Sequence, residues 1–313
     1  MFQFGLALGG GAAKGFSHLG VLKVLESARI TPDLIVGTSM GALIGAIYSW
    51  KGNIEETREH FSRFLESEYY DRKTYQKFKE IDQKEPEGVW VALKHLITKG
   101  VIYGKAIAVR SLLSPEDYEE DLKILVPVTD FNQLKIPFGC IASDLINGDE
   151  VLITSGNLRK AIMASCAIPG IYSPVITKDR FLVDGGSTNK VPVNPAFQLG
   201  ADVVIGVDVS RHLETISDPG SAMDIILRSN SVSTHRLDML QSLNADLLLC
   251  PKVDDLHWAD FSQMETAMSR GIQIAEKNLK NIRRLLLRKR LKKALWAFGR
   301  HPIYHPAKII HIE

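Results

Sequence analysis

Cysteine is scarce in this chain, which has only three among its 313 residues. Cys140, Cys166 and Cys250 lie far apart, in apolar surroundings and without the close spacing of a metal or redox motif. An odd number of scattered thiols argues against a disulfide framework and favours reduced core cysteines. Because no cluster of His, Asp or Glu stands at ligand spacing, the sequence predicts no metal site and no cofactor.

A secretory signal is also missing, since the chain begins on a strand-like run without a basic segment and a cleavage site. We therefore expect a cytoplasmic protein. Long apolar runs are equally rare. The stretch 34–50 has no charge, but its 17 residues are at the lower limit for crossing a bilayer. Its glycines and its Thr-Ser turn fit a buried strand–turn–helix unit better than a lipid-facing helix.

Acidic residues are absent near the end of the chain. Residues 277–312 contain eleven Lys and Arg and no Asp or Glu, whereas the rest has 27 basic and 36 acidic residues. The net charge of +2 therefore hides an acidic body and a basic tail. We expect the body to span residues 1–286 and the amphipathic tail residues 287–313.

The tail has an apolar stripe flanked by cations, a pattern typical of helices that bind the surface of an anionic bilayer. We predict a peripheral contact with the inner face of the membrane through Arg288, Lys289, Arg290, Lys292, Lys293, Trp296 and Phe298. Two alternatives are a helix packed on a partner subunit and a non-specific affinity for nucleic acid. No specific nucleic-acid binding is expected.

The order of apolar runs and breakers indicates an α/β fold. A strand over 2–8, a glycine-rich loop, a helix over 16–28, a strand over 34–36 and a helix from Met40 predict parallel strands joined by crossover helices. Strand and helix patterns return after residue 136, as strands over 137–142, 150–154, 180–183, 202–209 and 247–250 and helices over 158–166, 195–199 and 263–286.

Residues 53–125 differ from their surroundings, because they are charged, aromatic and mostly helical in pattern. We expect helices over 54–67, 69–84 and 89–98 that form either a helical insertion or a cap over a site. Most of its aromatic side chains would form the packed face of those helices.

The turn between residues 36 and 40 has the spacing of a nucleophile elbow, Gly37-x-Ser39-x-Gly41. Such a turn strains the serine backbone and lifts the hydroxyl clear of the sheet, while the following helix directs its N-terminal amides at a developing oxyanion. A helix-capping serine in a glycine-rich turn is the alternative interpretation. The strand–turn–helix context of an elbow is present.

The glycine-rich loop after the first strand also has several interpretations. It lacks the Gly-Lys-Ser/Thr of a P-loop, and Lys14 stands where G-x-G-x-x-G requires its last glycine. A looser dinucleotide loop would need an acidic residue after the next strand, which ends in Gly37 instead. The third interpretation is an oxyanion hole beside the elbow, which stabilises the transition state by about 3–4 kcal/mol per donor.

A serine nucleophile needs a proton acceptor. None of the nine histidines stands in a motif that marks it as the base, although His212, His235 and His257 remain possible. Asp184, at the end of a strand and before two glycines, is the better candidate. Asp-Gly is also a common tight-turn dipeptide, so a purely structural role stays open.

Four blocks in order resemble the patatin-like phospholipase family, over residues 4–52 and 136–210. They are the loop 8–15, the elbow 37–42, the segment Ala164–Pro174 and Asp184-Gly-Gly186. The resemblance implies a three-layer α/β/α sandwich and acyl-ester hydrolysis of phospholipid or lysophospholipid by a Ser39–Asp184 dyad. It implies an oxyanion hole at Gly10, Gly11 and Ala12, supported by Lys14, Gly15, Gly37, Gly41, Gly185 and Gly186.

The sequence departs from the family pattern at two positions that are occupied by lysine. Lys14 replaces the usual arginine, and its point charge cannot form a bidentate fork. Lys190 replaces an asparagine often found after Asp-Gly-Gly. The alternative function is therefore a catalytically weak protein of the same fold that binds lipid or regulates a partner. A nucleotide-binding protein is a further alternative, for which the sequence lacks the phosphate and ribose motifs.

Overall fold

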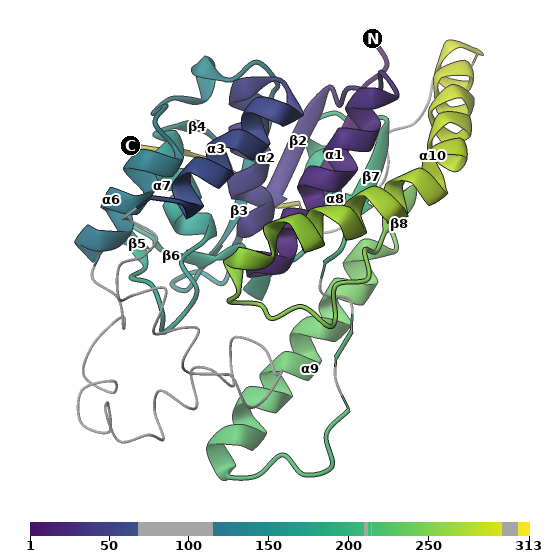
Figure 1. The fold of residues 1–313 in the computed structure, drawn as a ribbon. Helices are drawn as coiled ribbons and strands as arrows, with labels where there is room; N and C mark the ends of the chain where they lie inside the picture. Colours follow the sequence, from purple (N-terminus) through teal and green to yellow (C-terminus); the bar gives the residue numbers. More distant parts are fainter. Residues whose placement is uncertain (68–114, 210–211, 214, 296–305) are drawn as a thin grey trace.

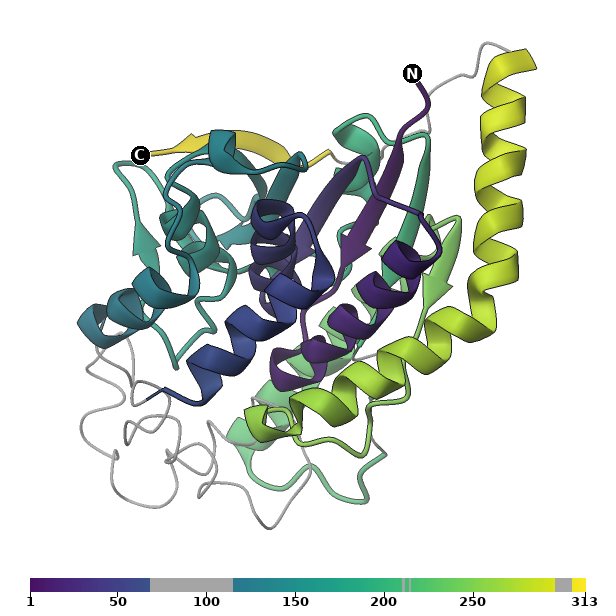
Figure 2. The same ribbon diagram turned by 45° about the horizontal axis from the view of Figure 1, so that its top comes forward.

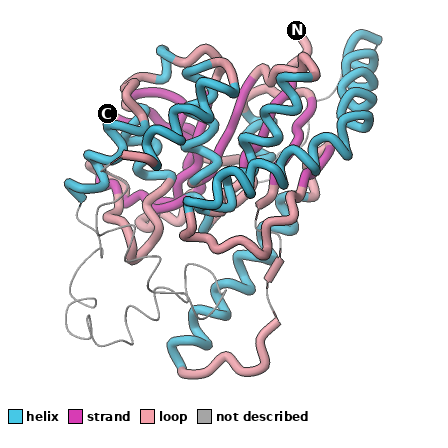
Figure 3. Tube along the Cα trace, in the orientation of Figure 1, coloured by secondary structure: helices cyan, strands magenta, loops and turns pink. Residues whose placement is uncertain are grey.

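The computed structural model describes residues 1–67, 115–209, 212–213, 215–295 and 306–313. A mostly parallel sheet forms its centre, with helices on both faces (Figures 1 and 3). The described strands are β1 (Phe4–Leu8), β2 (Leu34–Thr38), β3 (Phe138–Asp144), β4 (Glu150–Gly156), β5 (Val175–Ile176), β6 (Phe181–Asp184), β7 (Val203–Val207), β8 (Leu247–Leu249) and β9 (Lys308–Ile312). The predicted α/β/α sandwich is confirmed.

The helices follow the crossover pattern expected of parallel strands. The described α-helices are α1 (Ser17–Ser27), α2 (Met40–Lys51), α3 (Ile54–Leu65), α6 (Pro115–Leu125), α7 (Leu158–Ser165), α8 (Val193–Gln198), α9 (Ala222–Ser242) and α10 (Met264–Leu295). Short 3-10 turns are η1 (Ala12–Phe16), η2 (Phe131–Gln133), η3 (Gly185–Ser187) and η4 (Phe261–Gln263). The helices predicted over 69–84 and 89–98 lie outside the described residues.

Strand order explains how distant segments meet. Along the sheet the order is β5-β6-β3-β2-β1-β7-β8, with β4 on β3 and β9 on β4. Since β4 pairs with one edge of β3, β2 and β6 share the other edge, and they approach from opposite directions. Thr38 pairs with Ile141, and Asp184 pairs with the next residue, Ala142. The carboxyl ends of β2 and β6 therefore meet head to head.

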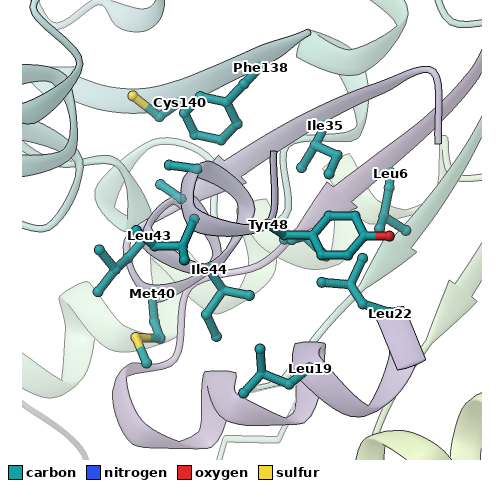
Figure 4. Packing of buried hydrophobic residues seen from close by; sticks show 14 of the residues in the cluster. Leu6, Leu19, Leu22, Ile35, Met40, Leu43, Ile44, Tyr48, Phe138 and Cys140 are labelled. Atoms are coloured by element: carbon teal, nitrogen blue, oxygen red, sulfur yellow. The ribbon is translucent and has the colours of Figure 1, made fainter. Parts of the chain in front are cut away.

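Alternating side chains of the strands fill two separate cores. Leu6 and Leu8 of β1 belong to the core beneath α1 and α2, whereas Ala7 points to the opposite face, which α8 covers. Figure 4 shows the first of these cores from close by, with leucines of α1 and the apolar face of α2 packed over β1 and β2. Because all five residues of β1 and of β2 are buried, both faces of these strands are covered by other elements.

Helix α10 is continuous across the predicted boundary at residue 286. Its first half crosses α1 at a close approach: a Cβ on Gly20 would lie 2.0 Å from the carbonyl oxygen of Met268, and one on Gly271 would lie 1.8 Å from that of Ser17. Its second half turns away along the edge of the sheet (Figure 2). Among the described residues, no helix combines the length and hydropathy needed to cross a membrane.

The end of the predicted tail belongs to the body. Residues 308–312 form β9, which pairs in parallel with β4, and the carbonyl of Ile312 accepts a hydrogen bond from the N–H of Asn157. The expectation of a separate tail from 287 to 313 is therefore corrected at its end. The local sequence could not predict this strand, because a strand of five residues is stable only through its pairing with the distant strand β4.

Candidate active site

Ser39 stands at the carboxyl end of β2, as the N-cap of α2. Its backbone has φ 53° and ψ −125°, a strained conformation for a residue with a side chain. The N–H of Ser39 donates a 3.0 Å hydrogen bond to Oγ of Ser165, which is fully buried at the end of α7. The strained turn is thus held by a hydroxyl from another element.

The two glycines of the elbow are needed for space. A Cβ on Gly37 would lie 2.4 Å from the Cα of Ala42, and one on Gly41 would lie 2.1 Å from the carbonyl oxygen of Leu8. Real Cβ atoms do not approach backbone so closely. The predicted elbow geometry is therefore present, with α2 packed directly against the end of β1.

Asp184 ends β6 and is buried, with 7% of its surface exposed. Its N–H donates to the carbonyl of Ala167 and its own carbonyl accepts from the Ser143 hydroxyl, at 2.9 and 3.0 Å. Oδ1 accepts a 2.8 Å hydrogen bond from the N–H of Gly186. Gly185 packs on β3, where a Cβ would lie 2.4 Å from the carbonyl oxygen of Ile141.

Ser39 and Asp184 are neighbours in space. The Ser39 hydroxyl lies close enough to the Asp184 carboxylate to lower its pKa, as do the Gly186 N–H and the charge of Lys190. Burial acts more strongly in the other direction and raises the pKa of Asp184 to about 6. Oδ2 is buried without a well-directed hydrogen bond to any described residue. A buried carboxyl with this pKa can accept a proton near neutral pH.

The glycine loop lies against the elbow. A Cβ on Gly10 would lie 3.2 Å from the Cβ of Ser39, so the loop passes the serine at a tight approach. The amide of Gly10 already donates to the carbonyl of Lys190 at 3.0 Å. The amides of Gly11 and Ala12 donate to no acceptor among the described residues, and Ala12 lines the same cavity as Ser39.

The supporting residues of the loop have structural partners. Gly15 packs against α2, since a Cβ there would lie 2.5 Å from Cγ of Met40. Nζ of Lys14 donates to the carbonyl of Asp254 at 3.4 Å. The replacement of arginine by Lys14 therefore changes a contact with a neighbouring loop.

His18 is a residue of the site that sequence reasoning missed. It is fully buried in α1, and Nε2 lies 2.8 Å from the carbonyl oxygen of Gly9. Burial lowers the pKa of His18 to about 4, so the ring is neutral near pH 7 and Nε2 must carry the proton that Gly9 accepts. A histidine within an apolar helix, just after a glycine loop, is the sequence signal that could have found it.

The histidines considered as bases lie elsewhere. Nε2 of His212 lies 3.9 Å from a carboxylate oxygen of Asp254, and Nδ1 of His257 accepts from the N–H of Ala259. The pKa of His235 is lowered by burial and then by the charge of Lys190. The carboxyl group whose pKa responds to the Ser39 hydroxyl is that of Asp184.

A cavity of about 100 Å³ opens beside Ser39. Its walls are mainly apolar and come from η1, α2, α3, α6 and the segments around residues 168 and 260, and they include Met40, Phe61, Tyr172 and Trp258. The thiol of Cys166 also lines it, and burial raises the pKa of this thiol well above its usual value. The cavity is therefore suited to an uncharged chain that ends at the Ser39 hydroxyl.

The cations predicted to bind a membrane lie at the other end of the sheet. Nζ of Lys293 contacts a carboxylate oxygen of Asp202 at 2.6 Å, and Nζ of Lys289 contacts one of Asp246 at 2.5 Å. Asp202 and Asp246 precede β7 and β8, which run parallel to β1 and hence to β2. Ser39 instead follows the carboxyl end of β2.

Of the other tail residues, Arg288 and Lys292 are exposed, and the guanidinium of Arg290 lies 5.8 Å from the centre of the Phe2 ring. Trp296 and Phe298 lie outside the described residues.

The family model for patatin-like phospholipases matches residues 6–197, which include the glycine loop, the elbow and Asp184. The chain belongs to the patatin-like phospholipase family. The match covers more than half of the chain and includes both Ser39 and Asp184.

An uncharacterised NTE family protein of Mycobacterium tuberculosis is 28% identical over 219 residues, which are 70% of this chain and 51% of that protein. Lysophospholipase NTE1 of Scheffersomyces stipitis is 24% identical over 298 residues, covering 87% of this chain and 18% of that protein. This chain thus spans about half or less of the length of these relatives. VipD of Legionella pneumophila has a TM-score of 0.43 and 15% identity, covering 88% of this chain and 67% of that one.

Proposed function

We propose that this patatin-like phospholipase family member is a carboxylic ester hydrolase that releases fatty acid from phospholipid or lysophospholipid. The observation that carries the proposal is the head-to-head meeting of β2 and β6, which brings the Ser39 hydroxyl to a buried carboxyl with a pKa of about 6. A serine beside a carboxyl base can form an acyl-enzyme, the chemistry of ester hydrolysis in two steps.

In the first step, Oγ of Ser39 attacks the ester carbonyl carbon while Asp184 accepts its proton. The tetrahedral oxyanion would be held by the amides of Gly11 and Ala12, aided by the N-terminal end of α2. Collapse expels the alcohol, which takes the proton from Asp184. Water, deprotonated by the same carboxylate, then attacks the acyl carbon of the acyl-enzyme. The bond from that carbon to Oγ of Ser39 breaks, Oγ takes the proton back from Asp184, and the fatty acid is released. The amide of Gly10 would not bind the oxyanion, because it already donates to the carbonyl of Lys190. Gly10 would contribute only by letting the loop pass close to Ser39.

The substrate class follows from the cavity beside Ser39. Its mainly apolar walls would take the acyl chain, while the alcohol portion of the lipid would leave through the open side. The NTE1 relative is named a lysophospholipase, which supports a lipid with one or two acyl chains as the substrate of this chain. A cytoplasmic protein acting at a membrane surface is the setting that we expect for it.

The decisive experiment combines covalent labelling with turnover. The wild type should react with a fluorophosphonate probe and release fatty acid from lysophosphatidylcholine, whereas Ser39→Ala should do neither. Ser49→Ala is the matched control, because Ser49 is a fully buried serine whose hydroxyl has no hydrogen-bond partner among the described residues. If the wild type does not react with the probe and hydrolyses none of the lipid esters tested, the result would favour the alternative of a catalytically weak lipid-binding or regulatory protein.

A further inference from the structure

Helix α9 has its apolar side facing outward. None of its described side chains is buried, although the helix has 21 residues. Its half-buried face is polar apart from Leu227, and it includes Asp224, Arg228, Ser231, Thr234, Asp238 and Gln241. The opposite face exposes large apolar side chains, namely Ile225, Ile226, Val232, Leu237, Met239 and Leu240, followed by Leu243 just after the helix. A helix that packs only on its own body has the reverse arrangement.

The polar face of α9 rests on the loop that follows Asp184. Nε2 of Gln241 donates to the carbonyl of Thr188 at 3.0 Å, and the N–H of Lys190 donates to Oδ1 of Asp238 at 3.3 Å. The carbonyl of Lys190 in turn accepts from the amide of Gly10. A chain of hydrogen bonds, from two side chains of α9 to backbone groups, therefore connects α9 with both the Asp184 segment and the glycine loop.

The first turns of α9 extend beyond the body at the end of the sheet where β1 and β2 finish (Figures 1 and 3). The turn after β3 is at the same end, since β3 is parallel to β2, and it exposes Leu145 and Ile146. The first turns of α9, which carry Ile225 and Ile226, are thus at the end of the molecule that presents Ser39. The Lys289 and Lys293 ion pairs are at the opposite end.

The charges of α9 are also arranged by face. Both of its acidic residues, Asp224 and Asp238, lie on the half-buried side. Arg236 is exposed among the apolar side chains, where its guanidinium can reach lipid phosphates while its stem stays with the leucines. An apolar face with a cation and without an exposed acid complements a phospholipid surface better than it complements a second copy of itself.

We infer that the face of α9 formed by Ile225, Ile226, Val232, Leu237, Met239, Leu240 and Leu243 docks into a phospholipid surface and brings the Ser39 end of the sheet to it. The role of this docking, which is to bring Ser39 to its lipid substrate, rests on the proposed function. The docking itself needs only the helix face. The lipid contact predicted for the basic tail is at the wrong end of the sheet to present Ser39.

The test measures vesicle binding without turnover, in the Ser39→Ala background. Ile225→Ser with Ile226→Ser removes two exposed side chains from α9. Leu287→Ser with Leu291→Ser removes two side chains of similar exposure from α10, as the matched control. On flotation with vesicles of phosphatidylcholine and phosphatidylglycerol in equal parts, we expect the α9 pair to weaken binding by about tenfold or more. The α10 pair should change it by less than about twofold.

Arg236→Gln should weaken binding to these vesicles and leave weak binding to pure phosphatidylcholine unchanged. Undiminished binding of the α9 pair, or equal loss in the α10 pair, overturns the inference. The inference is also overturned if the protein does not bind vesicles but forms a dimer, and if the double substitution in α9 dissociates that dimer in sedimentation velocity. If Ser39→Ala binds vesicles through α9 while the wild type hydrolyses no ester, the proposed function fails and the docking surface stands.

Discussion

Thr38, the last residue of β2, and Asp184, the last residue of β6, pair with consecutive residues of β3. The proximity of Ser39 to Asp184 is therefore set by main-chain pairing with one shared strand. Neither residue depends on a long loop for its position. Substitutions that spare this pairing should change the chemistry of the pair without separating its members.

Asp184→Asn should abolish ester hydrolysis while making the protein more stable above neutral pH. The pKa of Asp184 is raised from 3.8 to about 6 by burial. The protonated form is therefore favoured in the fold, and this stabilisation is lost as the pH rises through about 6. We expect the free energy of unfolding in urea at about pH 8 to rise by about 3 kcal/mol, with no gain at about pH 3.5. Equal stability of variant and wild type at both pH values would refute the assignment.

The pH dependence of hydrolysis should report the same group. As Asp184 must be ionised to accept the proton of Ser39, kcat/KM for a water-soluble short-chain ester should fall about tenfold per pH unit below about 6 and level off above it. The measurement should use an ester in solution, so that vesicle binding does not contribute. A profile that is flat from about pH 5 to about pH 8 would exclude this carboxylate as the base.

Ser165→Ala should lower kcat more than it changes KM. The variant removes the acceptor of the Ser39 N–H and leaves that amide buried in a strained turn, which costs about 1–3 kcal/mol of stability. Ser49→Ala, which removes a buried hydroxyl without a partner among the described residues, should change both quantities little. Rescue by Ser165→Thr, which restores a hydroxyl, would separate a positioning role from a packing defect. Identical losses in the two alanine variants would contradict this role.

His18→Leu should reduce ester hydrolysis, because the Gly9 carbonyl loses its donor and the neighbouring loop loses an anchor. His18→Gln keeps an N–H donor and should retain most of the activity. The pKa of His18 is lowered to about 4, so the stability that the neutral ring contributes is present above about pH 6.5 and lost as the pH falls through about 4. The glutamine variant should therefore lose less stability than the wild type between these pH values, as measured by urea unfolding.

Local patterns predicted the parts of the site that are close in sequence. The elbow around Ser39, the glycine loop and the strand before Asp184 depend on glycine spacing and on short apolar runs, which one sequence records. The meeting of β2 with β6 could not be predicted from one sequence, because it depends on which edge of β3 each strand takes. Gly10 was predicted as an oxyanion donor, and only the fold reveals its bond to Lys190.

Helix α9 was missed for a different reason. Its middle contains Ser229, Asn230, Ser231, Ser233 and Thr234, which have modest helix propensity and usually indicate a loop. The β9 strand was assigned to the tail because residues 277–312 are basic as a whole, and its pairing with β4 is a contact between segments about 150 residues apart.

The end of α7 holds both partners of the proposed pair. Ser165 accepts from the backbone of Ser39, and two residues later the Ala167 carbonyl accepts from the backbone of Asp184. Any thermal displacement of this short stretch would therefore move the Ser39 hydroxyl and the Asp184 carboxyl in the same direction. A ligand that displaced the end of α7 would therefore move Ser39 and Asp184 together relative to the glycine loop, and it would lower the proposed hydrolysis while the two side chains kept their positions relative to each other.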